Sequence, residues 1–297
     1  MRPVAAASDA RSPLLASAWG SGMAVAMAAL VGCTAESGPG PAGLSEGSLG
    51  VLVIERRSPA SGEAAELPAA LGASFARYRG VGAEAVLDIV GSPVLTEGCV
   101  DLGARTDGPD VAEAEIELLD VGPIRVAAAS SSIELSPRTF PAVGDLLAGV
   151  FYAGEAELPP ADAVPTYDIS APGNAEVGAL EATLPAAAPP AGLRVDGAID
   201  GERVPRGRDL VLSWTDGGRA EAFVEVVVSR ADGVAGAACT SVDDGSISVP
   251  ASMLARVRGS GAHVRVRRVL VRQLEIAGLD RAEARIVAGA SLDVDLE

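Results

Sequence analysis

Short runs of apolar or alternating residues recur along the first part of the chain after residue 50. They are bounded by Gly, Pro and Asp, as in Asp120–Pro123 and Ala171–Asn174, and these residues favour turns over extended strands. Several short strands at this spacing predict a mostly β fold of the β-sandwich or barrel-like kind. The expected strands are residues 50–55, 85–90, 116–119, 124–127, 133–135, 150–152 and 167–169.

One segment of this part has a helical pattern instead. Leu67, Leu71 and Phe75 are four residues apart, and residues of an α-helix at this spacing lie on one face. We therefore expect a short helix within residues 63–79.

The alternation of apolar and polar residues in the last third of the chain predicts a second β unit. Leu210, Leu212 and Trp214 alternate with polar residues, so they are expected on one strand face, with Trp214 anchoring the core of an immunoglobulin-like sandwich. Residues 239–242 and 247–249 flank the turn Asp243-Asp244-Gly245 and predict a hairpin. Further strands are expected at residues 223–229, 263–274 and 286–296, and one or two helical turns at 250–257.

Residues 184–192, which read Leu-Pro-Ala-Ala-Ala-Pro-Pro-Ala-Gly, separate these two parts. Proline cannot donate to a strand ladder, so this segment is interpreted as a linker. Charge changes at the same place: residues 34–192 hold 23 acidic residues and 7 arginines, whereas residues 193–297 hold 16 and 14. The sequence therefore predicts an acidic β-rich domain at 50–183 and an immunoglobulin-like domain at 193–297.

The first 33 residues have a different pattern. Arg2 and Arg11 precede a run of small and apolar residues, which is typical of a secretory signal. The run ends in Leu30-Val31-Gly32-Cys33, which resembles the lipobox of bacterial lipoproteins. That resemblance implies a signal peptide at 1–32, cleavage before Cys33 and acylation of this cysteine, followed by a flexible Gly/Pro-rich tether over residues 33–49. A lipoprotein cysteine carries more than one acyl chain, which makes a stable anchor in the bilayer. Thr34 stands where an Asp would indicate inner-membrane retention, so we expect an outer membrane lipoprotein facing the periplasm or the surface.

Three further sequence segments resemble a group of uncharacterised lipoproteins from GC-rich Gram-negative bacteria. They are Tyr167–Gly173, Glu176–Leu180 and Arg208–Thr215. The resemblance covers most of residues 80–257, and it implies β-sandwich domains and a lipid anchor. The resemblance rests on segments typical of turns and strands and includes no catalytic motif, so it implies no activity.

The two remaining cysteines, Cys99 and Cys239, are 140 residues apart. In an oxidising envelope such a pair favours a disulfide that joins the two halves of the chain. The alternative is two buried free thiols. A structural zinc site is not expected, because the chain has one histidine and no Cys-x-x-Cys.

The net charge of the chain is −17, which disfavours nucleic acid as a partner because phosphate binding needs excess positive charge. Arginines nevertheless gather near the C-terminus. Alternation, with a slip after residue 267, would place several of them on one strand face. This stripe has three interpretations: a site for an anionic glycan, lipid headgroup or acidic partner, a solvated face, or an internal match to the acidic first domain. Its members are Arg256, Arg258, Arg265, Arg267, Arg268 and Arg272.

No catalytic constellation stands out in the sequence. His263 is the only histidine and lies in an alternating strand. Asp243-Asp244 could contribute to a calcium site, but they lack EF-hand-like spacing, and a tight hairpin turn explains them without a metal. We therefore predict a non-enzymatic envelope lipoprotein with a structural or binding role, without metal or cofactor, whose partners are the bilayer and an envelope protein or glycan. The alternative is a surface hydrolase or glycan-active enzyme that uses two carboxylates.

Overall fold

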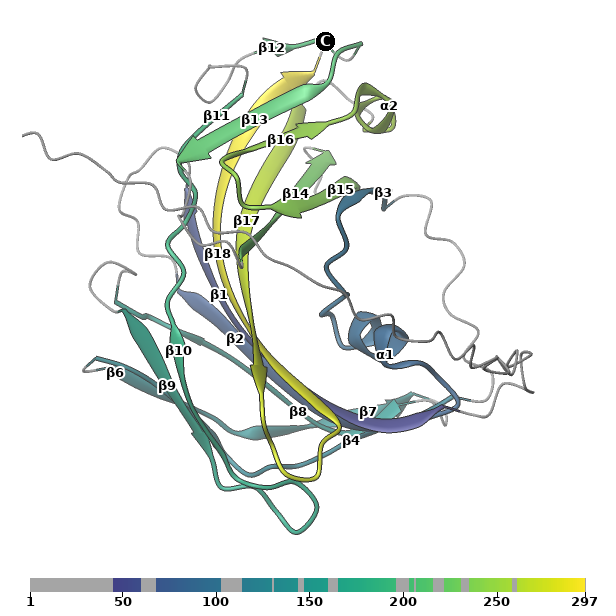
Figure 1. The fold of residues 1–297 in the computed structure, drawn as a ribbon, viewed down its shortest axis with the longest axis vertical. Helices are drawn as coiled ribbons and strands as arrows, with labels where there is room; N and C mark the ends of the chain where they lie inside the picture. Colours follow the sequence, from purple (N-terminus) through teal and green to yellow (C-terminus); the bar gives the residue numbers. More distant parts are fainter. Residues whose placement is uncertain are drawn as a thin grey trace, which may run out of the picture. The chain divides into compact units, whose positions relative to one another are not determined.

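The computed structural model describes residues 45–59, 68–102, 114–129, 131–143, 147–159, 165–195, 203–205, 207–215, 222–230, 235–257 and 261–296. These residues form a mostly β fold with several sheets, as the sequence predicts (Figure 1). The first half contains β1 (Glu46–Pro59), β2 (Ala69–Arg79), α1 (Ala83–Ile89), β3 (Gly98–Asp101), β4 (Glu115–Leu118), β5 (Ile124–Ala128), β6 (Ser131–Leu135), β7 (Pro137–Val143), β8 (Leu147–Ala156), β9 (Thr166–Ala171) and β10 (Leu180–Pro185). The second half contains β11 (Ala191–Val195), β12 (Arg203–Val204), β13 (Leu210–Thr215), β14 (Ala222–Arg230), β15 (Ala235–Val242), β16 (Ser246–Val249), α2 (Ala251–Leu254), β17 (Gly261–Leu274) and β18 (Arg281–Leu296).

The largest sheet draws strands from both predicted domains. Its order is β3-β15-β14-β17-β18-β1-β2-β4-β8-β7, with β12 also paired to β18. The two halves meet where β1 pairs in parallel with β18, from Leu49 opposite Arg281 to Pro59 opposite Ser291. The strand pairings therefore cross the boundary predicted at residues 184–192, and both ends of that predicted linker belong to strands, β10 and β11.

Two smaller sheets cover different parts of the same face of the large sheet. One has the order β10-β9-β5-β6 and the other β11-β13-β16. Strand β18 contributes to the core under each of them. Ala282, Ala284 and Ile286 pack in the first core with β9 and β10, and Leu292 and Val294 pack in the second core with β13. Because all five have even numbers, they lie on one face of the strand.

The region predicted to be helical at 63–79 is the strand β2 over its described part. Leu71 and Phe75 are buried on one face together with Ala69 and Ala73. A spacing of four residues keeps side chains on one face of a strand as well as of a helix, since four is a multiple of the strand period. The alternating small residues between them supply the strand pattern, so the helix prediction was wrong.

The opposite error occurs at residues 85–90, which were expected as a strand but lie largely in helix α1. Its last turn ends in Gly91, whose φ of 78° lies in the left-handed region that glycine adopts freely. The amide of Gly91 donates to Asp88 O, and that of Ser92 donates to Leu87 O, in the manner of a Schellman motif. Val86 and Leu87 are buried against the odd-numbered face of β1, opposite the face that β9 and β10 cover.

The second half matches most of its predicted strands but not their pairing. Leu210, Leu212 and Trp214 share the buried face of β13, and Trp214 is in the core, as expected. The predicted hairpin is wrong, because β15 pairs with β14 and β3 whereas β16 pairs with β13 in another sheet. Asp243–Gly245 therefore carries the chain from one sheet to the other, across the core that Trp214 fills.

The predicted tether at 33–49 ends earlier than expected. Glu46–Leu49 already belong to β1, where Glu46 is opposite Arg79, and Leu49 is buried. Cys33 and the predicted signal peptide lie outside the described residues. Neither helix of the described part is long and apolar enough to cross a bilayer.

Candidate functional site

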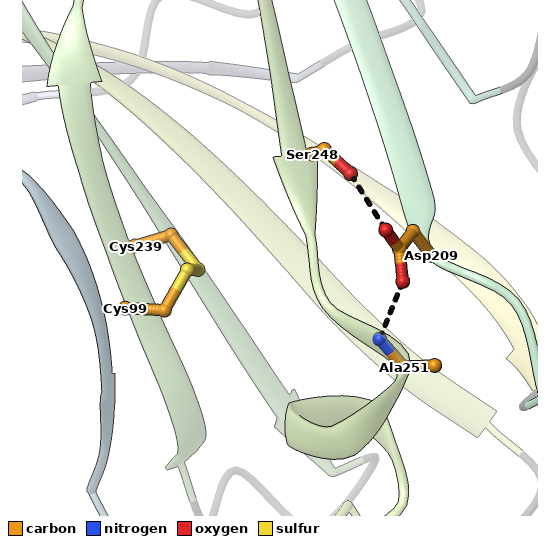
Figure 2. The surroundings of a disulfide bond; sticks show 5 residues. All are labelled: Cys99, Asp209, Cys239, Ser248 and Ala251. Atoms are coloured by element: carbon orange, nitrogen blue, oxygen red, sulfur yellow. Dashed lines mark hydrogen bonds between the residues drawn. A yellow bond between two sulfur atoms is a disulfide. The ribbon is translucent and has the colours of Figure 1, made fainter.

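The disulfide between Cys99 and Cys239 is formed, which confirms the favoured interpretation of the two cysteines (Figure 2). The two residues are directly opposite each other in β3 and β15. Cys239 is 1% exposed and belongs to the core under β13, and Cys99 packs against that core. The bond therefore fixes an edge strand from the first half to the sheet of the second half.

Two further contacts hold the surroundings of the disulfide. Arg256, after α2, forms an ion pair with Asp101 at the end of β3. Asp209, just before β13, accepts hydrogen bonds from the amide of Ala251 at 2.9 Å and from the hydroxyl of Ser248 at 3.4 Å (Figure 2). The side chain of Asp209 thus connects β16 and the start of α2 to the start of β13.

The predicted arginine stripe is not one surface. Arg258 lies outside the described residues, and Arg256 pairs with β3. Arg265 and Arg267 share one face of β17, as the alternation predicts. Arg268 lies on the opposite face, because β17 pairs with both neighbours without the expected slip. Arg272, also even-numbered, is on that opposite face further along the strand.

Two basic residues on the odd-numbered face of β17, Arg267 and His263, lie next to carboxylates of the neighbouring strands. Arg267 is paired with Glu225 on the neighbouring strand β14, with a distance of 3.0 Å between Nε and the carboxylate. His263 lies on the same face, and its Nδ1 is 2.8 Å from a carboxylate oxygen of Asp293. Alternating acidic and basic groups therefore occupy this face, and the exposed positive charge is smaller than the sequence suggests.

Arg268 is the unexpected member, since it is 3% exposed. Its Nε donates to Asp243, and the other oxygen of Asp243 accepts from Trp214 Nε1 at 2.7 Å. Its two remaining nitrogens donate to the carbonyl oxygens of Ala188 at 2.7 Å and Thr215 at 3.1 Å. Burying this charge is tolerable because every arm of the guanidinium has an acceptor.

The position of Arg268 gives this network its role. Along β17 it lies between Val266, in the core under β13, and Leu270, in the core under β9 and β10. Through Ala188 it also holds the segment that joins β10 to β11. The network therefore fixes the junction of the two cores. Both carboxylate oxygens of Asp243 accept hydrogen bonds within it, so this side chain has a structural role.

A second buried charge network lies on the other face of the large sheet. Glu283 is 1% exposed and accepts hydrogen bonds at 2.7 Å from both Arg281 and Arg285. Burial alone raises the pKa of this carboxyl, but hydrogen bonds and positive charge from the two arginines outweigh it, so the pKa is lowered. Arg285 also donates to Pro93 O at 2.6 Å and so holds the segment that follows α1.

A charged groove of about 600 Å³ lies where the start of β1, the end of β2 and the start of β4 are side by side in the large sheet. Acidic and basic residues alternate across these strands, with Arg79 between Glu46 and Glu115 and Arg77 opposite Glu117. Arg77 is 3.4 Å from Glu117, and both side chains are at least half exposed. The groove can therefore exchange its own ion pairs for those of a charged ligand.

The hydroxyl of Tyr78 and the turn before β18 close one side of this charged groove. Burial and the neighbouring carboxylate of Asp280 raise the pKa of the Tyr78 hydroxyl, so it stays protonated and can donate a hydrogen bond. Asp280 itself accepts from the amide and the hydroxyl of Ser48, at 2.8 and 2.9 Å. No sequence signal marks this groove, because residues that meet in it, such as Ser48 and Asp280, are 232 positions apart in the chain.

A smaller groove, of about 300 Å³, lies beside the end of α1 on the odd-numbered face of β1. We call it the apolar groove; its floor includes Val53 of β1, Ala70 and Gly72 of β2 and Phe151 of β8, and its wall includes Val90 and Ser92. Within the described residues, no group of three or more His, Cys, Asp or Glu side chains is placed to hold a metal ion.

Comparison with known proteins finds no relative of this chain. No family model, curated protein or solved structure matches the chain. The site must therefore be interpreted from its own geometry.

Proposed function

We propose that this protein is exported and anchored to the outer membrane through acylated Cys33, and that it has a structural or binding role in the cell envelope. The observation that carries the proposal is the Cys99–Cys239 bridge. Disulfides persist in oxidising compartments such as the periplasm and are rare in the cytosol. This agrees with the signal-like pattern of the first 33 residues and with their ending in Leu30-Val31-Gly32-Cys33.

The charged groove supports a binding role. Exposed carboxylates and guanidinium groups that alternate across three strands suit a partner with both charges, such as a protein surface. Ion pairs of this exposed kind contribute little to stability, about 0–1 kcal/mol each, so exchanging them for intermolecular pairs costs little.

Metabolic labelling with an alkyne analogue of palmitate tests the anchor. The wild-type chain is expected to incorporate the label, and Cys33→Ala is expected to lose it. Cys99→Ala serves as the matched control, since it removes a cysteine that the proposal assigns to a disulfide, and it should be labelled like the wild type. Label retained by Cys33→Ala, or a purified native chain that begins at Met1 without acyl mass, refutes the anchor.

Density-gradient separation of the two membranes tests the location. The labelled wild-type protein is expected with the outer membrane, and replacing Thr34 by Asp is expected to move it toward the inner membrane. Recovery of the labelled wild type with the inner membrane contradicts the proposed location while leaving the lipid anchor intact.

A further inference from the structure

The chain between α1 and β3 crosses the outer face of the large sheet, which is the face opposite to the two small sheets. At its start, Pro93 O accepts a hydrogen bond from Arg285 of β18 at 2.6 Å. At its end, Cys99 of β3 is bonded to Cys239 of β15. We call residues 93–98 the strap, and Figure 1 shows it as the connection from α1 to β3.

The length of the strap leaves it little choice of path. The strands β17, β14 and β15 lie between β18 and β3, so its two ends are four strand spacings apart. At about 4.8 Å each, these spacings add up to about 19 Å. The six residues from Pro93 to Cys99 reach about 20–22 Å when fully extended. Arg285 is paired with Glu283 on its own strand, which keeps the start of the strap near β18. The strap therefore runs nearly straight over β17 and β14.

A row of apolar side chains lies under this path. Phe223 of β14 is opposite Val269 of β17, and Val269 is opposite Val287 of β18, so the three share the outer face. Val269 is 3% exposed and Val287 is 5% exposed, although neither belongs to any of the three cores. Their burial on this face requires a cover, and the strap is the described segment whose path crosses them.

The strap is held mainly at its two ends. No backbone hydrogen bond joins residues 94–97 to another described residue. The strand β3 is a four-residue edge strand whose side chains are exposed or half-buried, with Val100 53% exposed. Besides the disulfide, its contacts include the short ladder to β15, the amide of Leu102 donating to Gly236 O at 3.2 Å, and the ion pair of Asp101. Such a short edge contact with a half-exposed ion pair restrains the chain little, so the disulfide is the main restraint at this end.

We propose that the Cys99–Cys239 bond is a redox-sensitive switch: when a dithiol reduces it, β3 and the strap leave the sheet and uncover the apolar row of Phe223, Val269 and Val287. The proposal gives the bond a regulatory role in addition to its effect on stability. It does not require the lipid anchor.

The reduction starts at the accessible sulfur. Cys99 is half-buried on the edge strand whereas Cys239 is 1% exposed, so a thiolate of the dithiol attacks Cys99 Sγ. The S–S bond breaks, and Cys239 leaves as a thiolate that takes a proton from water. The second thiol of the reductant then displaces Cys99, which also becomes a thiol. The reductant gives up two electrons and two protons and ends as a disulfide.

Hydrogen–deuterium exchange of the whole chain, with and without dithiothreitol, tests the release. Reduction is expected to raise the exchange rates of amides in residues 94–101 at least about tenfold, while those of β18 change less than about twofold. The double variant Cys99→Ala/Cys239→Ala is the control. It should exchange like the reduced wild type and should not respond to dithiothreitol. The wild type in its two redox forms carries the test even where the variant does not fold.

Methyl NMR with a neutral gadolinium chelate in the solvent tests the uncovering directly, because the chelate broadens the signals of exposed methyl groups. The signals of Val269 and Val287 are expected to broaden only in the reduced protein. Val264 is fully buried in the core under β13, and its signals should stay sharp in both forms.

The proposal is overturned if residues 94–101 exchange at the same rate in both redox forms, or if the chelate leaves Val269 and Val287 unbroadened after reduction. It is equally overturned if dithiothreitol does not reduce the bond in the folded chain, or if β14, β17 and β18 gain exchange as strongly as the strap, since that result is a general loss of stability. These outcomes do not depend on acylation of Cys33, so they leave the proposed anchor untouched.

Discussion

Replacing Cys99 and Cys239 together by alanine is expected to lower the free energy of unfolding by about 5 kcal/mol. The bridge closes a loop with a sequence separation of 140 residues. In the chain-entropy model a loop of this length removes about 5 kcal/mol of conformational freedom from the unfolded chain at 25 °C. Truncating the buried Cys239 side chain adds a smaller loss of packing in the core under β13.

The single variants make this prediction specific to the bond. Either Cys99→Ala or Cys239→Ala opens the bridge, so each should lose nearly the whole effect, and the double variant should lose little more. Two independent side-chain effects would instead add. Guanidinium denaturation followed by the fluorescence of Trp214, which lies in the affected core, measures all three differences.

Reductant provides the control for these measurements. The wild type with its disulfide reduced should unfold like Cys99→Ala, and the double variant should not respond to reductant. A loss below about 1 kcal/mol in the double variant, or singles whose losses add up, would refute the view that the bond restrains the unfolded chain.

The remaining predictions concern the two buried charge networks. Arg268→Met leaves Asp243 buried without its cation and is expected to cost about 3–5 kcal/mol in urea denaturation. Arg265→Met, at a half-buried arginine on the other face of β17, should cost less than about 1 kcal/mol. The lowered pKa of Glu283 stabilises the fold fully above the ordinary value of 4.5, and this contribution is lost as the pH falls through the lower folded pKa. Denaturation curves from about pH 6 to pH 3 should therefore show an acid-side loss that Glu283→Gln lacks, and an identical loss in that variant contradicts the assignment.

Most of the strands could be predicted because alternation of apolar and polar residues is a local property of the chain. Leu210, Leu212 and Trp214 show this most clearly, since their spacing already places them on one buried face. The errors have local causes too. Leu71 and Phe75 satisfy both the helix and the strand period, and the apolar residues 85–90 are too few to distinguish a buried strand from a helix that packs on a sheet.

The candidate sites were predicted less completely than the strands. The pairing of Cys99 with Cys239 followed from counting cysteines, but the arginines near the C-terminus were grouped by sequence although the strand separates them onto two faces. The apolar groove has no signal in the sequence, because Gly72, Ser92 and Phe151 come from three elements and are ordinary residues individually.

The sequence by itself determined the β class, the faces of its amphipathic strands, the signal-like beginning and the disulfide partners, because each depends on residue type and short spacing. Only the tertiary structure decided that β1 pairs with β18, that both halves share one sheet, and that Arg268 joins two cores. Strand pairing is selected by the free energy of burying whole faces against partners more than 200 residues away, and a buried arginine is stable only where that pairing supplies Asp243 and carbonyl oxygens.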